Sequence, residues 1–247
     1  MPFFPPIWFD KLDSTNTQLK QMVVDNSQLP SGTVIATHHQ TSGRGRLSRQ
    51  WQSAPGENLT FSALLRTNMN HVDLPSLPLV VGVAIVDTIK DYALQGQLKW
   101  PNDVLVAHKK IAGVLVELLP SPDGHTANCI IGIGLNINMS LENAMLIDQP
   151  TTSIFIETRK TNAVQPVLDL LLLHLLKRVS SWENDGFSAI KDIWLQNAVA
   201  LNTTVSINKG NATTISGIHR GIGTTGEILL EAPDGTITGH FCGDLLL

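Results

Sequence analysis

The chain has 247 residues and a formal net charge of −4, from 17 Lys and Arg against 21 Asp and Glu. Hydrophobic residues make up 43% of the sequence and charged residues 15%, a composition that buries a sizeable core and excludes intrinsic disorder. The weak net acidity also argues against a protein that coats nucleic acid with a basic surface.

The first 200 residues mix strand and helix patterns. Ser14, Thr15 and Asn16 are candidate N-caps of a helix that carries apolar residues at helical spacing. Further helices are predicted over residues 77–92, which have the period of a buried helix, and 167–182, which are amphipathic. Strands are predicted over residues 33–37, 59–65, 98–100, 104–106, 111–119 and 129–138.

The pattern changes near Leu201, where short β-type runs separated by glycine-bearing turns begin. These runs cover residues 203–207, 213–218, 227–231 and 236–241. Short strands at this spacing indicate a small barrel. We place the boundary at residues 198–202, which gives domains of residues 1–199 and 200–247.

The sequence gives no sign of secretion or membrane insertion. The apolar run over residues 77–86 is too short to span a bilayer, and the N-terminus lacks the basic region and apolar core of a signal peptide. Two cysteines, Cys129 and Cys242, are too few for a disulfide framework, and we expect both to be buried apolar residues in a reducing compartment. These features predict a cytoplasmic protein with no membrane partner.

Four segments carry residue types suited to chemistry. In Gly43–Arg49, three arginines lie within six residues and are interleaved with glycines, which is typical either of an anion site or of a solvated turn. Asn102 and Asp103 lie in a turn where they either face a ligand or cap the turn. Lys110 begins an apolar strand and is either a site residue or a surface lysine. Two glycines in the strand that follows, Gly132 and Gly134, indicate close approach of a ligand or of another part of the chain.

Together and in this order, the segments resemble the biotin–protein ligases. The resemblance covers the chain from about Trp8 to the end. It is carried by the cap Ser14-Thr15-Asn16, the loop Gln40-Thr41-Ser42-Gly43-Arg44-Gly45-Arg46 that ends at Trp51, the turn Lys99-Trp100-Pro101-Asn102-Asp103, and the strands with Lys110-Ile111-Ala112-Gly113 and Gly132-Ile133-Gly134-Leu135-Asn136.

The resemblance implies an α+β fold, in which a mixed β-sheet with flanking helices, related to class II aminoacyl-tRNA synthetases, precedes an SH3-like C-terminal barrel. It implies that ATP and Mg²⁺ activate biotin to biotinyl-5′-AMP, with release of pyrophosphate. The biotinyl group then passes to one lysine of a biotin carboxyl carrier protein, such as that of acetyl-CoA carboxylase. Family members include homodimers, and nothing in this sequence decides between monomer and dimer.

The resemblance also implies roles for individual residues. Those expected to bind biotin are Ser14, Thr15, Asn16, Gln40, Arg44, Gly45, Arg46, Lys110, Gly113, Gly132 and Gly134. Those expected to bind the nucleotide are Arg44, Arg46, Trp51, Asn102, Lys110, Asn136 and Arg220. Mg²⁺ is expected to be held mainly by phosphates, with no protein ligands assigned.

The reaction explains why cations are needed. Attack of a carboxylate on an α-phosphate brings two anions together, and Arg46, Lys110 and Mg²⁺ would neutralise them. Asp103 is a candidate proton acceptor when the carrier lysine attacks.

This sequence differs from some family members in two places. The catalytic pattern starts almost at residue 1, with no preceding helix-turn-helix, so we expect a ligase that has no DNA partner. Residues 149–154 lack the tryptophan that some members stack on the adenine, which leaves the adenine contacts open. The alternatives are a lipoate or octanoyl ligase of the same fold and a non-catalytic biotin sensor.

Overall fold

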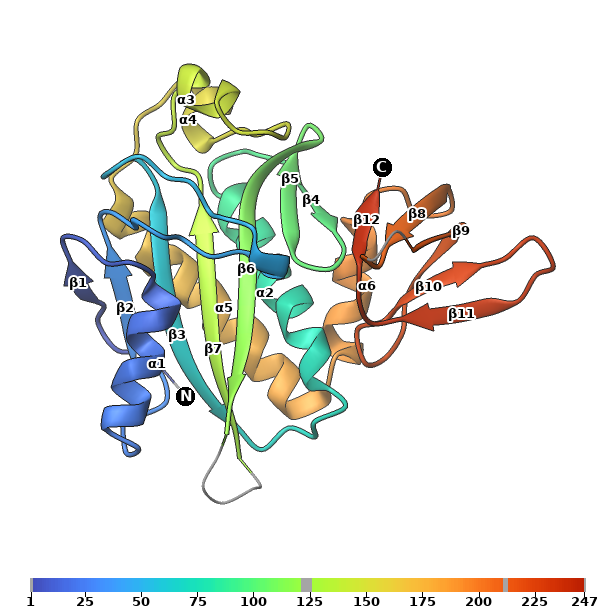
Figure 1. Cartoon of the computed structure of the whole chain (residues 1–247), viewed down its shortest axis with the longest axis horizontal. Helices are drawn as coiled ribbons and strands as arrows, with labels where there is room; N and C mark the ends of the chain where they lie inside the picture. Colours follow the sequence, from blue (N-terminus) through green and yellow to red (C-terminus); the bar gives the residue numbers. More distant parts are fainter. Residues whose placement is uncertain (1, 121–125, 211–212, 247) are drawn as a thin grey trace.

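The computed structural model describes residues 2–120, 126–210 and 213–246. A seven-stranded sheet in the order β1-β2-β3-β7-β6-β5-β4 forms its larger part (Figure 1). Strands β1 and β2 are parallel, and every other neighbouring pair is antiparallel. The strands are β1 (Ile7–Phe9), β2 (Val34–Thr37), β3 (Leu59–Thr67), β4 (Gly96–Lys99), β5 (Asp103–Val106), β6 (Lys109–Leu119) and β7 (Ala127–Leu135).

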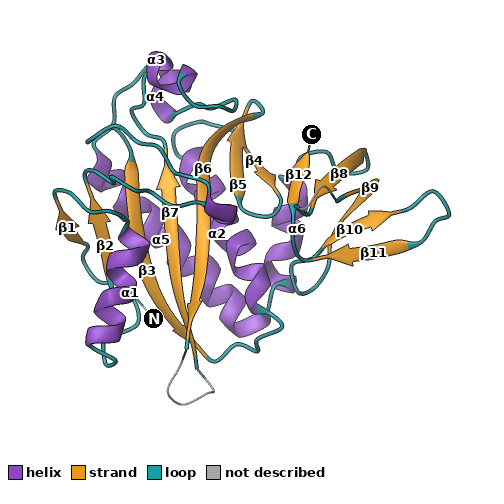
Figure 2. Cartoon of the chain, in the orientation of Figure 1, coloured by secondary structure: helices purple, strands orange, loops and turns teal. Residues whose placement is uncertain are grey.

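Helices cover both faces of this sheet (Figure 2). Helix α1 (Thr15–Asp25) packs on one face through Leu19 and Val23. Helices α2 (Leu77–Lys90) and α5 (Val164–Asp185) pack on the other face and against each other. The main core therefore lies between the sheet and the α2–α5 pair.

The alternation of side chains along a strand separates the core from a polar face. On β3 and β7, Phe61, Ala63, Ile131 and Ile133 point into the main core. The alternate residues Ser62, Gly132 and Gly134 lie on the opposite face, which α1 covers. The glycines therefore lie on the face where α1 begins, and not in the main core.

A five-stranded antiparallel sheet follows, in the order β11-β10-β9-β8-β12. Its strands are β8 (Thr204–Asn208), β9 (Thr214–Ile222), β10 (Ile228–Glu231), β11 (Ile237–His240) and β12 (Asp244–Leu246). Helix α6 (Ser188–Gln196) contacts β9, and Trp194 meets the fully buried ring of His219 edge-on at 6.5 Å between ring centroids. Apolar side chains of this sheet join the main core, and the division into domains at residue 200 stays a prediction.

The structure confirms the predicted helices and strands and adds elements that the sequence did not indicate. Ser14 occupies the N-cap position of α1, although its side chain makes no capping hydrogen bond. The strand predicted over residues 129–138 ends at Leu135. The added elements are β1, α3 (Leu141–Met145), α4 (Ile154–Thr158), α6, β12 and two 3₁₀ turns, Arg46–Ser48 and Leu74–Ser76.

The prediction for the cysteines is half wrong. Cys129 is buried in β7, and burial raises the pKa of its thiol to about 12. Cys242 is exposed, because it lies in the turn between β11 and β12 and not inside a strand whose side chains face the core. In the described part of the chain, no helix combines the length and the apolar character needed to cross a membrane.

Candidate functional site

A cavity opens on the polar face of the large sheet, where the N-terminus of α1, the loop of residues 40–51 and strands β6 and β7 meet. Sequence-predicted site residues form most of its wall. They are Ser14, Thr15, Asn16, Gln40, Arg44, Gly45, Arg46, Trp51, Asn102, Asp103, Lys110, Gly113, Gly132 and Gly134. Segments that are far apart in the sequence therefore converge on one space.

One end of the cavity is built from neutral polar groups. The backbone N–H of Thr15 donates to Gln40 Oε1 at 2.8 Å. The hydroxyl of Ser62, on β3, lies 2.7 Å from Thr15 Oγ1 and 2.6 Å from Asn16 Oδ1. Thr15, Asn16 and Ser62 are all buried, so this network is fixed by packing as well as by hydrogen bonds.

The strand glycines make room for side chains of the site itself. A Cβ at Gly132 would collide with the Asn16 side chain, and a Cβ at Gly134 would collide with the ring of Trp51. A Cβ at Gly113 would lie 3.3 Å from the Trp51 ring and 3.2 Å from Cε of Lys110. Because these three positions have no side chain, Asn16, Trp51 and Lys110 can pack directly against the backbone of the sheet.

The loop of residues 43–51 folds back on itself beside the cavity. The N–H of Gly45 donates to the carbonyl of Arg49 at 2.8 Å, and that of Trp51 donates to the carbonyl of Gly43 at 2.9 Å. Leu47 and Ser48 at its tip have left-handed backbone, with φ of 51° and 62°. Such conformations are uncommon outside glycine, so the tip is a locally strained turn.

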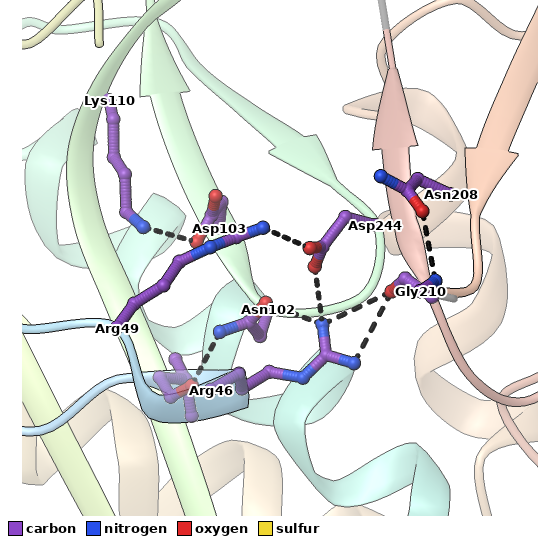
Figure 3. Close-up of polar contacts among 10 residues, drawn as sticks. Arg46, Arg49, Asn102, Asp103, Lys110, Asn208, Gly210 and Asp244 are labelled. Carbon is purple, nitrogen blue, oxygen red and sulfur yellow. Dashed lines mark hydrogen bonds and ion pairs between the residues drawn. The ribbon is translucent and has the colours of Figure 1, made fainter. Parts of the chain in front are cut away.

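Arginines from this loop reach the C-terminal sheet (Figure 3). The guanidinium of Arg46 donates to Asp244 Oδ1 at 3.1 Å and to the carbonyl of Gly243 at 3.3 Å, and Arg49 also pairs with Asp244. Burial lowers the pKa of Arg46, and the negative charges of Asp244 and Asp103 oppose that shift. Arginine stays charged near neutral pH, so Arg46 brings a partly buried positive charge to the cavity wall.

A second cation stands at the same end. Lys110 Nζ lies 2.7 Å from Asp103 Oδ1, and both side chains are less than a fifth exposed. It also lies 5.9 Å from the centre of the Trp51 ring. Asn102 and Asp103 lie next to each other in the chain and bind one cation each. Asn102 Oδ1 accepts a hydrogen bond from Arg46 at 3.3 Å, and Asp103 pairs with Lys110.

A second cavity adjoins the first on the far side of Trp51 and Lys110. Its wall includes Asn136, which follows β7, and Ile147, which lies after α3. The buried amide of Asn136 donates to the carbonyl of Thr152 at 3.0 Å, but its Oδ1 has no partner among the described residues. Such a buried acceptor is rare in proteins and indicates a site for a missing donor.

A second buried asparagine, Asn58, lacks a partner for its donor group, whereas Asn136 lacks one for its acceptor, among the described residues. Asn58 precedes β3 and lines a third hollow that shares Ile147 with the second cavity. Its Oδ1 accepts from the N–H of Ile137 at 3.0 Å, while its buried Nδ2 has no partner among the described residues. Asn58 and Asn136 therefore offer one unused donor and one unused acceptor on adjacent strand ends.

The structure separates two of the predicted residues from the main cavity. Asn136 lines the adjoining cavity, as just described. Arg220 lies in β9, where its guanidinium bonds to Glu231 at 2.5 Å and Asn202 at 3.0 Å, and it lines neither cavity.

Sequence reasoning missed several residues that contact the site. Ser62 and Glu117 are polar residues inside apolar strands, a signal that could have identified them. Asn58 and Asp244 offered no such signal, because only the folded chain brings them to Asn136 and Arg46.

Comparisons with known proteins agree with this site. The sequence model of the biotin/lipoate A/B protein ligase family matches residues 8–136. The bifunctional ligase/repressor BirA of Bacillus subtilis is 33% identical over 236 residues, which cover 93% of this chain and 70% of that protein. The biotin–[acetyl-CoA-carboxylase] ligase of Paracoccus denitrificans is 28% identical, over 91% of this chain and 93% of that protein.

A solved structure extends the similarity to the fold. The biotin protein ligase from Aquifex aeolicus in complex with biotin and ATP is 29% identical and matches with a TM-score of 0.82, over 99% of this chain and 98% of that chain. The family match, the relatives and the shared fold together show that this chain belongs to the biotin/lipoate A/B protein ligase family and is a biotin ligase enzyme.

Proposed function

We propose that this enzyme joins biotin to AMP, with release of pyrophosphate from ATP, and then transfers the biotinyl group to one lysine of a biotin carboxyl carrier protein. The observation that carries the proposal is the polarity of the cavity. Hydroxyl and amide groups of Thr15, Asn16 and Gln40 line the part beside α1, where the charge of Arg44 is paired with Glu117. Arg46 and Lys110 line the part beside Asn102 and Asp103. Biotin has the same polarity, with a neutral ureido head and a carboxylate tail.

The neutral end suits the ureido head. A planar, uncharged urea needs hydrogen-bond donors and acceptors and no counter-charge. Thr15 and Gln40 provide hydroxyl and amide groups that are already ordered, Thr15 by Ser62 and Gln40 by the backbone N–H of Thr15. Ordered partners reduce the entropy lost on binding, which favours a ligand of this shape.

The cationic end suits adenylation. A carboxylate oxygen of biotin attacks the α-phosphorus, and the bond from that phosphorus to the pyrophosphate oxygen breaks. Arg46 and Lys110 would stabilise the negative charge that builds up between the two anions. Because Asp244 and Asp103 already hold these cations in place, little reorganisation would be needed when the substrates arrive.

The second half-reaction needs a proton acceptor. The amine of the carrier lysine attacks the acyl carbon, the bond to AMP breaks, and the amine loses a proton. Asp103 is the acceptor that we propose, because it lies on the cavity wall 2.7 Å from Lys110. The positive charge of Lys110 would also stabilise the departing AMP.

The adjoining cavity suits the nucleotide base. The unused acceptor of Asn136 would take the exocyclic amino group of adenine. Ile147 and Leu246, on the wall of this cavity, would pack on the base in place of an aromatic residue. Arg220 stays a sequence-based candidate for this side.

Mg²⁺ would accompany ATP. Among the described residues there is no group of three or more His, Cys, Asp or Glu that could hold a metal ion. We propose that the phosphates are the main ligands of this ion, which would neutralise their charge. The homodimer and the absence of a DNA partner stay predictions of the sequence.

Pyrophosphate exchange into ATP tests the proposal and separates the acid substrates. Purified protein would be incubated with Mg-ATP and labelled pyrophosphate, with biotin, lipoate or octanoate in parallel. We expect exchange with biotin alone. Exchange with lipoate or octanoate would overturn the substrate assignment, and tight biotin binding without exchange would favour a non-catalytic sensor.

A further inference from the structure

We propose that Glu117 is a positioning residue that orients the hydrogen bonds offered to the biotin head, an inference that rests on the proposed function. Glu117 lies near the end of β6. It contacts Asn16 and Arg44, and both of these residues line the cavity. Its Oε2 accepts from Asn16 Nδ2 at 2.8 Å, and its Oε1 pairs with Lys20 at 2.5 Å and with Arg44 at 3.1 Å. One carboxylate thus joins helix α1 to the arginine loop.

The carboxylate fixes which way the Asn16 amide points. An ionised carboxylate only accepts hydrogen bonds, so it must face the Nδ2 group of Asn16. The second proton of Nδ2 is directed to the carbonyl of Leu115 at 3.3 Å. Asn16 Oδ1 is therefore turned toward Ser62, and the amide, which is 3% exposed, is held in this orientation.

The fixed orientation of the Asn16 amide also fixes the hydrogen bonds of Ser62 and Thr15, and Thr15 lines the cavity. Ser62 has a single hydroxyl proton, which it donates to Asn16 Oδ1. The Ser62 and Thr15 hydroxyl oxygens lie 2.7 Å apart, and because the Ser62 proton is used on Asn16, Thr15 is the donor in this contact; Gln40 Oε1, 3.3 Å from Thr15 Oγ1, is a second acceptor for the same proton. With its proton used in this way, Thr15 Oγ1 has only lone pairs left for a ligand, so it accepts an N–H group. The ureido head of biotin supplies such a group.

The local charges support this arrangement. Burial raises the pKa of Glu117, but the hydrogen bonds from Lys20 and Asn16 and the charges of Lys20 and Arg44 outweigh it, so the pKa is lowered overall. The carboxylate is therefore ionised near neutral pH and keeps its acceptor-only character. A glutamine at this position would offer both a donor and an acceptor, and the network would lose its fixed direction.

The test compares ligand binding by the wild-type chain and by Glu117→Gln, measured by titration calorimetry with biotin and, separately, with ATP. We expect the biotin Kd to rise about tenfold or more, as for loss of a hydrogen bond to a charged group, and the ATP Kd to stay within about twofold. Equal losses for both ligands would indicate general damage and overturn the inference.

A second variant and a modified ligand separate orientation from simple stability. Ser62→Ala interrupts the network beyond Asn16, so Glu117→Gln should weaken biotin binding much less in that background. A biotin methylated on a ureido nitrogen should lose more affinity for the wild type than for Glu117→Gln. Additive effects of the two substitutions, or equal effects of methylation, would contradict the inference.

Asp87→Asn is the matched control, because Asp87 is a similarly shielded carboxylate that makes two hydrogen bonds to Arg178, far from the cavity. It should leave the biotin Kd unchanged. If the wild type itself binds no biotin, the proposed function fails. If it binds biotin and Glu117→Gln binds it equally well, only the role of Glu117 is rejected.

Discussion

Replacement of Lys110 by methionine separates its chemical role from its structural role. Methionine keeps an unbranched stem beside Trp51 but removes the charge 2.7 Å from Asp103. Both side chains of this ion pair retain some exposure, at 18% and 19%. An ion pair that water still reaches contributes about 1 kcal/mol or less to folding, so Lys110→Met should remain folded.

The expected loss of activity is much larger. Loss of one group that stabilises transition-state charge typically lowers kcat by a factor of about 10²–10³, or roughly 2.7–4 kcal/mol. Biotin-dependent pyrophosphate exchange by Lys110→Met should fall by that factor. The unfolding free energy, measured with urea on the same samples, should change by about 1 kcal/mol or less.

The neighbouring residue provides the control. Lys109 side-chain exposure is 47%, and its Nζ is 3.8 Å from Glu157, outside both cavities. Lys109→Met therefore removes the same charge one position away and should keep normal exchange. Normal exchange by Lys110→Met, or equal losses for the two variants, would refute the role assigned to Lys110.

Three further predictions concern other parts of the molecule. Gly134→Ala places a methyl group against the ring of Trp51, and such overpacking should destabilise the fold by about 1–3 kcal/mol and shift the tryptophan fluorescence; an unchanged melting temperature and spectrum would contradict the packing described. Asp103→Asn should slow biotinyl transfer from pre-made biotinyl-AMP to the carrier, and an unchanged rate would remove Asp103 as the proton acceptor. Burial lowers the pKa of His219, so the unfolded chain binds more protons than the folded chain. The contribution of His219 to the free energy of unfolding should therefore be fully present above pH about 6.5 and should fall as the pH drops below that value. His219→Leu should flatten this pH dependence in urea titrations.

Local sequence signals predicted the strands and helices that form the sheet and its main core. The apolar period over residues 77–92 was sufficient for α2, and the β-branched runs were sufficient for β6 and β7. The three-residue strands β1 and β12 were missed, because three residues carry too little periodicity. These strands depend on pairing with β2 and β8.

The site was predicted where its residues form compact motifs and missed where they do not. Arg46 and Lys110 belong to short stretches with a recognisable composition, and the structure brings them to one cavity. Asp244 is separated from Arg46 by 198 positions, so no local pattern relates them. Arg220 had a suitable residue type, but Glu231 and Asn202 hold its guanidinium away from both cavities.

Gly132 illustrates the limit of reading one residue at a time. A glycine in a strand indicates close approach, but the sequence does not say of what. The structure shows that the close neighbour of Gly132 is Asn16, a residue of the protein itself. The glycine thus supports the site through the position of a side chain, and the sequence alone could not distinguish this from direct contact with a ligand.

Complete biotinylation of a carrier domain in one tube tests both half-reactions of the proposed function together. A biotin carboxyl carrier domain would be incubated with the purified protein, biotin and Mg-ATP, and its intact mass and modified residue determined by mass spectrometry, with ATP or biotin omitted in parallel. We expect addition of one biotinyl group to one lysine, only when both substrates are present. An unmodified carrier in the complete reaction, with folded protein that binds biotin, would contradict the proposed function.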